Sequence, residues 1–78
     1  MTQREKLIER IRARPPEAKA RDVQALLDDF GWRLDRQHGS HLVFFKPGEG
    51  FLSITLAGGR TVKRTYLDII CKRLGLDD

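Results

Sequence analysis

The chain has 78 residues and a formal net charge of +4, with 40% hydrophobic and 33% charged residues. A chain of this size is expected to form one domain with a thin core, burying only a little over ~60% of its unfolded surface. The composition excludes a largely disordered chain, and no apolar run approaches the roughly 18–20 residues that span a bilayer. The charged start MTQREKLIER has no apolar signal segment, so we expect a cytoplasmic protein.

The first predicted helix covers residues 3–14, where leucine and isoleucine form one apolar stripe. Two consecutive prolines in the next stretch, RPPEAKA, restrict the backbone away from the helical region and end this helix. We therefore expect residues 1–19 to form an N-terminal helical extension and linker. Residues 20–78 then form the main domain.

A second helix is predicted over residues 21–30. Its four apolar residues follow the i, i+3, i+4, i+7 spacing of an amphipathic helix: Val23, Leu26, Leu27 and Phe30. Gly31 ends this helix, because glycine readily adopts a positive φ.

Three strands are predicted next, from the segments WRLDRQ, HLVFFK and FLSITLA. The short turns between them, HGS and PGEG, contain glycine and favour an antiparallel meander. GGRTVK is interpreted as a loop. A last helix is predicted over residues 64–74, with an inner face made of Tyr66, Ile69, Ile70 and Leu74. Gly75 then ends it, with Leu76 closing a hydrophobic contact.

The element order is therefore α-α-β-β-β-α. Both core helices must bury an apolar stripe, and the sheet offers one strongly apolar face. The simplest arrangement is an α+β, two-layer sandwich, in which a three-stranded antiparallel sheet carries the helices on one face.

Alternation along the strands assigns the two faces of this sheet. The predicted core face carries Trp32, Leu34, Leu42, Phe44, Leu52, Ile54 and Leu56. The predicted open face carries His41, Val43 and Phe45, with Arg33, Gln37, Ser53 and Thr55. Exposed apolar groups beside a histidine indicate a contact surface. Equally, the helix at 3–14 would bury them if it folded over this face.

The other chemistry-bearing residues give weaker signals. Cys71 lies among core-type residues and is interpreted as a small buried side chain. His38 falls in a predicted turn, where an exposed histidine without a role is the default. Two histidines, one remote cysteine and scattered carboxylates form no recognisable metal-ligand set, so we expect no metal and no cofactor.

The positive charge is concentrated in the middle of the chain. Residues 32–64 contain six Lys/Arg and two Asp/Glu, whereas residues 1–31 contain seven and six, and residues 65–78 contain two and three. A localised positive field fits a polyanion such as RNA or DNA, or an acidic protein.

One ordered pattern, FGWRLDRQHGSHLVFF followed by a strand, a loop and a helix ending in RLGL, resembles the HicA toxins of bacterial toxin–antitoxin systems. The resemblance covers roughly residues 20–76 and is most specific at Gly31-Trp32 and Gly39-Ser40-His41. It implies a double-stranded-RNA-binding-domain-like fold, α-β-β-β-α, with His41 as the catalytic residue. It also implies metal-independent cleavage of mRNA and a HicB-type antitoxin partner. Leu42 stands where many members have a second histidine.

RNA cleavage needs few protein groups, because the 2′-hydroxyl of RNA is the nucleophile. A histidine moves protons near neutral pH, and one positioned acid–base group is typically worth about 10²–10⁴-fold in rate. We expect His41 to be the general acid or base, Gly39 to let the backbone approach the substrate, and Ser40 to orient the turn. The candidate phosphate contacts are Arg36, Lys46, Arg60 and Lys63.

Two other functions remain open from the residues. A non-catalytic RNA-binding module would share the fold and the basic middle of the chain. A protein-interaction domain would use Val43, Phe45 and the N-terminal helix, and would show no salt-dependent affinity for RNA.

Overall fold

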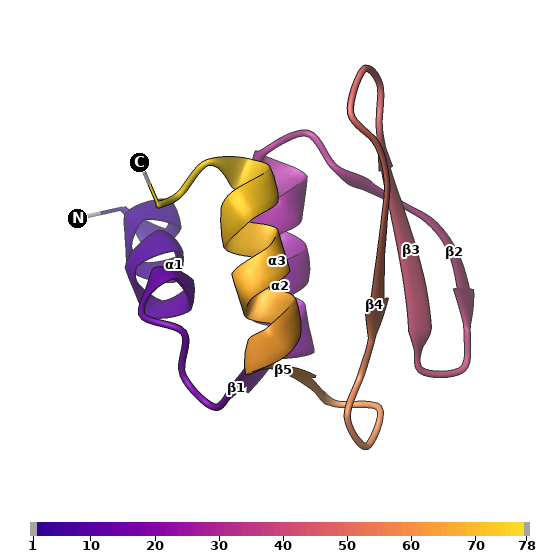
Figure 1. The fold of residues 1–78 in the computed structure, drawn as a ribbon, viewed down its shortest axis with the longest axis horizontal. Helices are drawn as coiled ribbons and strands as arrows, with labels where there is room; N and C mark the ends of the chain where they lie inside the picture. Colours follow the sequence, from indigo (N-terminus) through magenta and orange to yellow (C-terminus); the bar gives the residue numbers. More distant parts are fainter. Residues whose placement is uncertain (1, 78) are drawn as a thin grey trace.

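The computed structural model describes residues 2–77 and confirms the predicted α+β fold. Its helices are α1 (Gln3–Arg12), α2 (Ala20–Asp29) and α3 (Arg64–Leu74), and its strands are β1 (Glu17–Lys19), β2 (Arg33–His38), β3 (His41–Lys46), β4 (Gly50–Thr55) and β5 (Thr61–Lys63). Strands β2, β3 and β4 form an antiparallel sheet in that order, with the helices on one face (Figure 1). Apart from the three-residue β5, the run from α2 to α3 has the α-β-β-β-α order that the family resemblance implies.

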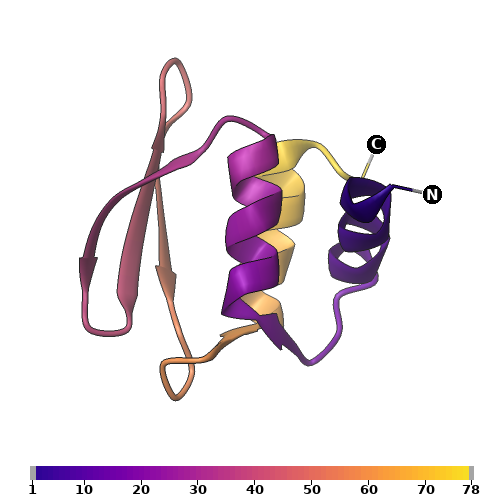
Figure 2. The same cartoon turned by 180° about the vertical axis from the view of Figure 1, so that it is seen from behind.

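The helices form two layers behind the sheet. In Figure 1, α3 lies in front of α2 between the sheet and α1, and Figure 2 shows the same order from behind, with α2 in front. Helix α1 packs on α2 and α3. It therefore leaves the open face of the sheet uncovered, and the idea that this helix buries Val43 and Phe45 is wrong.

A single apolar core joins all three layers. The largest fully buried side chains are Ile11, Val23, Leu26, Leu27, Trp32, Leu42, Ile54, Val62, Leu67, Ile70 and Cys71. The predicted core faces of β3 and β4 are confirmed, since Leu42, Phe44, Leu52 and Ile54 are all buried. Burying one such side chain stabilises the fold by roughly 1.5–3 kcal/mol. The prediction that Cys71 is a buried core residue is also confirmed.

Local sequence signals explain the ends of two helices. Thr2 and Glu5 form a reciprocal capping box at the start of α1. Gly75 ends α3 with a φ of 69°. The Leu76 N–H donates to the Cys71 carbonyl at 2.9 Å, and the buried Leu76 side chain closes the predicted hydrophobic contact.

Two predicted core residues are exposed. Leu34 is 46% exposed, because β2 is an edge strand whose residues are all exposed. Ile69 is 39% exposed. The buried face of α3 is instead made of Leu67, Ile70 and Cys71, which follow the i, i+3, i+4 spacing of one helix face. Ile69 lies beside this face rather than on it.

The stretches predicted to be a linker and a loop each contain a short strand. Strands β1 and β5 pair in antiparallel fashion, with Ala18 opposite Val62 and both side chains buried. Strands of three residues leave almost no periodic signal in a sequence. The pairing ties the start of α2 to the start of α3, at the lower end of the helices in Figure 1.

Arg14 joins the end of α1 to the end of the chain. It takes a left-handed φ of 52° before Pro15, and its guanidinium binds Asp68 at 3.0 Å and Asp77 at 2.6 Å. The hydrogen bond from Arg14 lowers the pKa of the Asp77 carboxyl. The pKa of Asp68 is also lowered, first by Lys72 and then by Arg14.

Candidate functional site

A β-bulge in the edge strand decides which residues share the face of His41. Leu34 pairs with Phe44 and Arg36 pairs with Val43, so Asp35 is the extra residue between them. Beyond the bulge, Arg36 and His38 turn to the open face, whereas Gln37 pairs with the core residue Leu42. The prediction that Gln37 lies on the open face is therefore wrong, since it assumed unbroken alternation.

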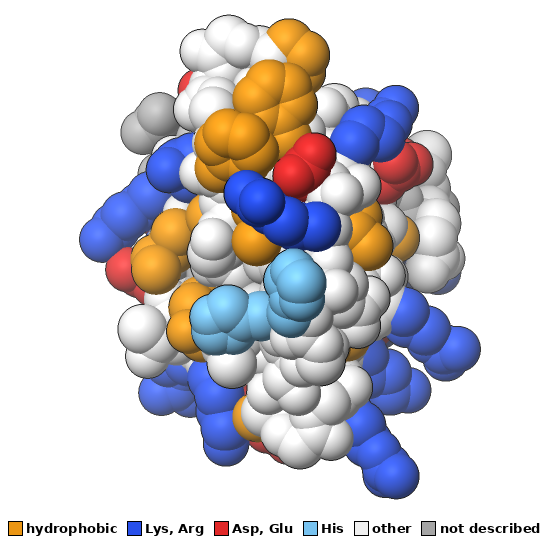
Figure 3. Space-filling view, turned by 90° about the vertical axis from the view of Figure 1, so that its right-hand side faces the viewer, with side chains coloured by type: hydrophobic (Ala, Val, Ile, Leu, Met, Phe, Trp, Pro, Cys, Tyr) orange, Lys and Arg blue, Asp and Glu red, His pale blue; other side chains and the backbone are white. Residues whose placement is uncertain are grey.

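The bulge brings the two histidines together. His38 ends β2, His41 begins β3, and they are directly opposite each other across a two-residue turn. Both residues are exposed. Figure 3 looks onto the open face and shows the two histidine side chains next to each other, with a basic side chain beside them. His38 is thus a strand residue in the site, and not part of the turn as predicted.

His41 is held in orientation by the neighbouring strand. It pairs with Thr55 of β4, whose hydroxyl lies 2.9 Å from the Nδ1 atom of His41. A hydroxyl is able to donate to an imidazole nitrogen or accept from it, so this contact serves either neutral tautomer. Because Nδ1 is engaged with Thr55, Nε2 is the ring nitrogen that points away from this contact.

The turn beside His41 is fixed by backbone contacts. Gly39 has a φ of 56°, which suits the first central position of a type II′ hairpin turn. Gln37 donates from Nε2 to the Gly39 carbonyl at 3.0 Å. The Ser40 carbonyl accepts from the Leu56 N–H at 2.8 Å. The turn is thereby braced on both sides, and it fixes where β3 and His41 begin.

Of the four predicted phosphate contacts, Arg36 lies beside the histidines. Arg36 is two residues before His38 on the same face, with its guanidinium 3.6 Å from the Asp35 carboxylate. Arg60 belongs to the loop after β4, but it lies at the start of α2: its carbonyl accepts from the Ala20 N–H at 3.0 Å, and it lines a pocket with Lys19, Ala20, Arg21 and Thr61. The same loop meets the hairpin turn through Gly59. A Cβ atom on Gly59 would lie 3.8 Å from the Ser40 hydroxyl.

The other two predicted phosphate contacts lie elsewhere. Lys46 ends β3 and faces the helix side, where its Cε atom would be 3.4 Å from a Cβ atom on Gly31. Since a strand rises about 3.3 Å per residue, Lys46 is roughly 16 Å from His41 along β3. Lys63 ends β5 under the helices, and its ammonium lies 3.5 Å from the Glu17 carboxylate.

The far end of the open face is aromatic. Phe45 and Phe51 are opposite each other on β3 and β4, with ring centroids 4.9 Å apart and planes tilted by 49°. They are 36% and 52% exposed. In Figure 3 hydrophobic side chains gather above the histidines, with basic side chains between and around them. Exposed aromatic rings of this kind are suited to stacking on bases or to packing against a protein.

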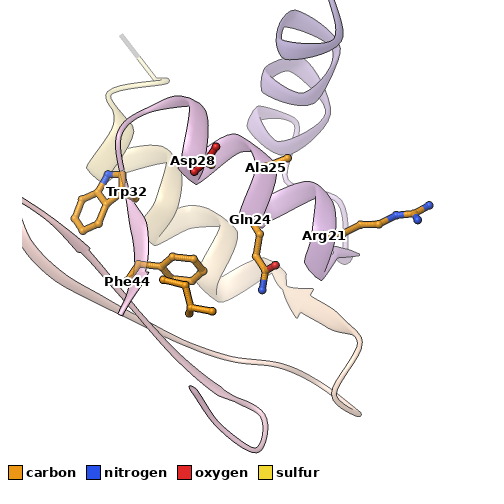
Figure 4. Close-up of a pocket in the computed structure, with 7 residues that line it drawn as sticks. Arg21, Gln24, Ala25, Asp28, Trp32 and Phe44 are labelled. Carbon is orange, nitrogen blue, oxygen red and sulfur yellow. The ribbon is translucent and has the colours of Figure 1, made fainter. Parts of the chain in front are cut away.

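Two pockets of the described region lie away from the histidines. A groove of about 380 Å³ runs between α2 and the sheet and is lined by Arg21, Gln24, Ala25, Asp28, Trp32, Leu34 and Phe44 (Figure 4). Figure 4 shows the Phe44 ring pointing toward α2, whereas the Trp32 ring points the other way, over α3, and Arg21 points away from the groove. The groove is on the opposite side of the sheet from His41. The histidine pair lies on an exposed surface of the sheet.

No metal site or membrane helix is found within residues 2–77. No group of three or more His, Cys, Asp and Glu side chains in this range is arranged to hold a metal ion. None of the helices there is long and apolar enough to cross a bilayer.

The fold and the site together define a small α+β domain with an exposed sheet face that carries two arginines and a histidine pair. A family model described as the HicA toxin of bacterial toxin–antitoxin matches residues 20–76. The chain therefore belongs to the HicA toxin family, and it is a toxin with an antitoxin partner. Comparison with curated proteins and with solved structures found no match.

Sequence reasoning missed two features of this site. It assigned His38 to a turn, because the bulge that turns this residue to the open face depends on pairing between strands. It placed Thr55 on the open face but gave it no role. The Thr55 contact with His41 follows from the β3–β4 register, which the alternation of each strand does not give by itself.

Proposed function

We propose that this toxin is a metal-independent endoribonuclease that cleaves mRNA, with His41 as a proton-transferring residue. The observation that carries the proposal is the exposed His41 ring, held through Nδ1 by Thr55 on an open sheet face that also carries Arg33 and Arg36. Its free nitrogen is then directed to a substrate lying across the sheet. RNA brings its own 2′-hydroxyl nucleophile, so the protein supplies proton transfer and positive charge.

The basic residues around the turn have distinct roles in this proposal. Arg36 contacts phosphates beside the scissile bond, and the Gly39-Ser40 turn lets the RNA backbone approach closely. Arg60, Lys46 and Lys63 contribute to the general positive field. Phe45 and Phe51 stack on bases or pack against the antitoxin.

A cleavage assay with the purified full chain tests the proposal. The protein is incubated with end-labelled mRNA in the presence of EDTA, so that cleavage without a metal is measured directly. We expect His41→Ala to lower the cleavage rate by at least about 10²-fold. Glu49→Gln, in the exposed turn at the far end of the sheet, is the control and should cleave normally.

The two alternatives give different results in the same assay. A non-catalytic RNA-binding module would bind the RNA in a salt-dependent manner and release it intact. A protein-interaction domain would show no such affinity. If His41→Ala cleaved as fast as the parent, the role of His41 would be wrong, although cleavage itself would stand.

We further propose that the antitoxin is of the HicB type and covers the open face of the sheet. Val43, Phe45 and Phe51 give this face an uncovered apolar patch, as is common at protein interfaces. We expect Phe51→Ser to weaken antitoxin binding at least about tenfold, because aromatic anchors dominate interface energies. Unchanged binding in a titration would place the antitoxin on another surface.

A further inference from the structure

His38 lies next to His41 on the open face but has no role in the proposed mechanism. The bulge at Asp35 turns it to the open face, and the two-residue turn sets it directly opposite His41. Residues opposite each other in an antiparallel pair have Cβ atoms about 4.5–5.5 Å apart. Two exposed imidazoles are thereby held side by side on neighbouring strands (Figure 3). This separation allows both rings to reach the same phosphodiester.

We propose that His38 is a second catalytic residue, and that the His38–His41 pair performs the acid and base steps of RNA cleavage together. This inference rests on the proposed ribonuclease function. It concerns the same face of the sheet, and it assigns a role to a residue for which proton transfer had not been expected.

The reaction balances with these two side chains alone. One neutral imidazole removes the proton of the 2′-hydroxyl while that oxygen attacks the phosphorus. The bond from phosphorus to the 5′ oxygen breaks, and the protonated second imidazole gives its proton to this oxygen. The products are a 2′,3′-cyclic phosphate and a free 5′-hydroxyl, and the two histidines end with their protonation states exchanged. Water then restores them.

The structure also excludes position 42 as the source of the second proton-transfer group. Leu42 is 1% exposed and faces the helices, so any side chain at this position would lie on the wrong side of the sheet. The absence of a histidine there therefore does not remove a group from the open face. In this chain, His38 lies on the open face of the sheet, whereas position 42 lies on the helix side.

The surroundings of the pair are suited to acid–base chemistry. On β2 the charged neighbours are Arg36, on the same face, and Asp35 in the bulge. On β4 the residues facing the pair are the uncharged Thr55 and Ser53. No carboxylate is opposite either histidine in the β2–β3–β4 pairing.

The pH dependence of cleavage tests the inference. For the full chain we expect a bell-shaped profile of kcat/KM, because one histidine must be neutral and the other protonated. We expect His38→Gln to lower kcat/KM about 10²-fold at the optimum and to abolish one limb of the bell. A His38 that only binds or supports structure would lower the rate without changing the shape of the profile.

A double variant provides the matched control. Gln37→His combined with His38→Gln keeps the composition but moves the histidine to the position paired with Leu42, on the helix side. We expect this variant to be as slow as His38→Gln alone, and Gln37→His by itself, which keeps His38, measures the effect of losing the Gln37 hydrogen bond to Gly39. Thermal unfolding of each variant confirms that the fold is retained, as expected for changes at exposed positions.

The outcomes separate this inference from the function on which it rests. One outcome overturns the role of His38 and leaves the ribonuclease function standing. In it, the parent cleaves RNA and His41→Ala is inactive, whereas His38→Gln keeps the parental rate and both limbs of the pH profile. Full activity of the double variant would also overturn the role of His38. If the parent cleaves no RNA, both proposals fail.

Discussion

The two faces of the β2–β3–β4 sheet have the same strands but different physical roles. On the helix side, Leu42, Phe44, Leu52 and Ile54 are buried under α2 and α3 and stabilise the fold. On the open side, the alternate residues of the same strands carry two histidines, an aromatic pair and arginine side chains. Residues that stabilise the fold therefore alternate along each strand with residues of the candidate site. A substitution on one face should leave the property of the other largely intact.

The sharpest test of this separation is a pair of adjacent phenylalanines. Phe44 is 2% exposed and Phe45 is 36% exposed. We expect Phe44→Ala to cost about 3–5 kcal/mol of unfolding free energy, through lost burial and a cavity. We expect Phe45→Ala to cost about 1 kcal/mol or less, mostly from its contact with Phe51. Urea unfolding of both variants measures the difference. Equal losses of unfolding free energy would show that the two faces contribute equally to stability.

A smaller effect is expected on the open face, where Thr55 orients His41. Thr55→Val has nearly the same shape but removes the hydroxyl 2.9 Å from Nδ1. We expect kcat for RNA cleavage to fall about tenfold with little change in KM, because the ring is misoriented rather than lost; tenfold corresponds to ~1.4 kcal/mol. Ser53→Ala, one alternate position away on β4, is the control. An unchanged kcat would show that Thr55 does not position His41.

The smallest effect concerns pH and belongs to the helix side of the molecule. The pKa values of Asp68 and Asp77 are lowered in the fold from their ordinary value of 3.8, so their ionised forms stabilise the folded state. This contribution is present above about pH 3.8 and is lost as the pH falls below that value through the folded pKa values. We expect thermal stability to decrease in this acid range.

Replacing the cation common to both carboxylates gives the control for this pH effect. Arg14→Met removes the ion pairs at 3.0 and 2.6 Å, and should flatten the loss of stability below about pH 3.8. Lys72 still contacts Asp68 at 3.0 Å, so part of the dependence is expected to remain. An identical pH dependence in the parent and in Arg14→Met would contradict the role of Arg14.

Much of the fold was predictable because its signals are local. The three helices were predicted from apolar spacing, with bounds within two residues of those observed. The faces of β3 and β4 were predicted because alternation is unbroken in both strands. Leu34 was predicted to be buried, and this is wrong. It does lie on the helix side of the sheet, but its strand β2 is at the sheet edge, where all residues of the strand are exposed. For the candidate site, His41 was predicted on the open face, whereas its neighbours His38 and Thr55 were not assigned a role.

The sequence by itself determined the helices, the three main strands, the open face of β3 and the family to which the chain belongs. These follow from periodicity, glycine positions and an ordered motif, all of which are read along the chain. Only the tertiary structure decided the bulge at Asp35, the pairing of β1 with β5 and the position of α1 behind the other helices. The reason is that each depends on contacts between segments distant in sequence, where one extra residue turns every later side chain to the other face. The presence of His38 beside His41 belongs to this second group.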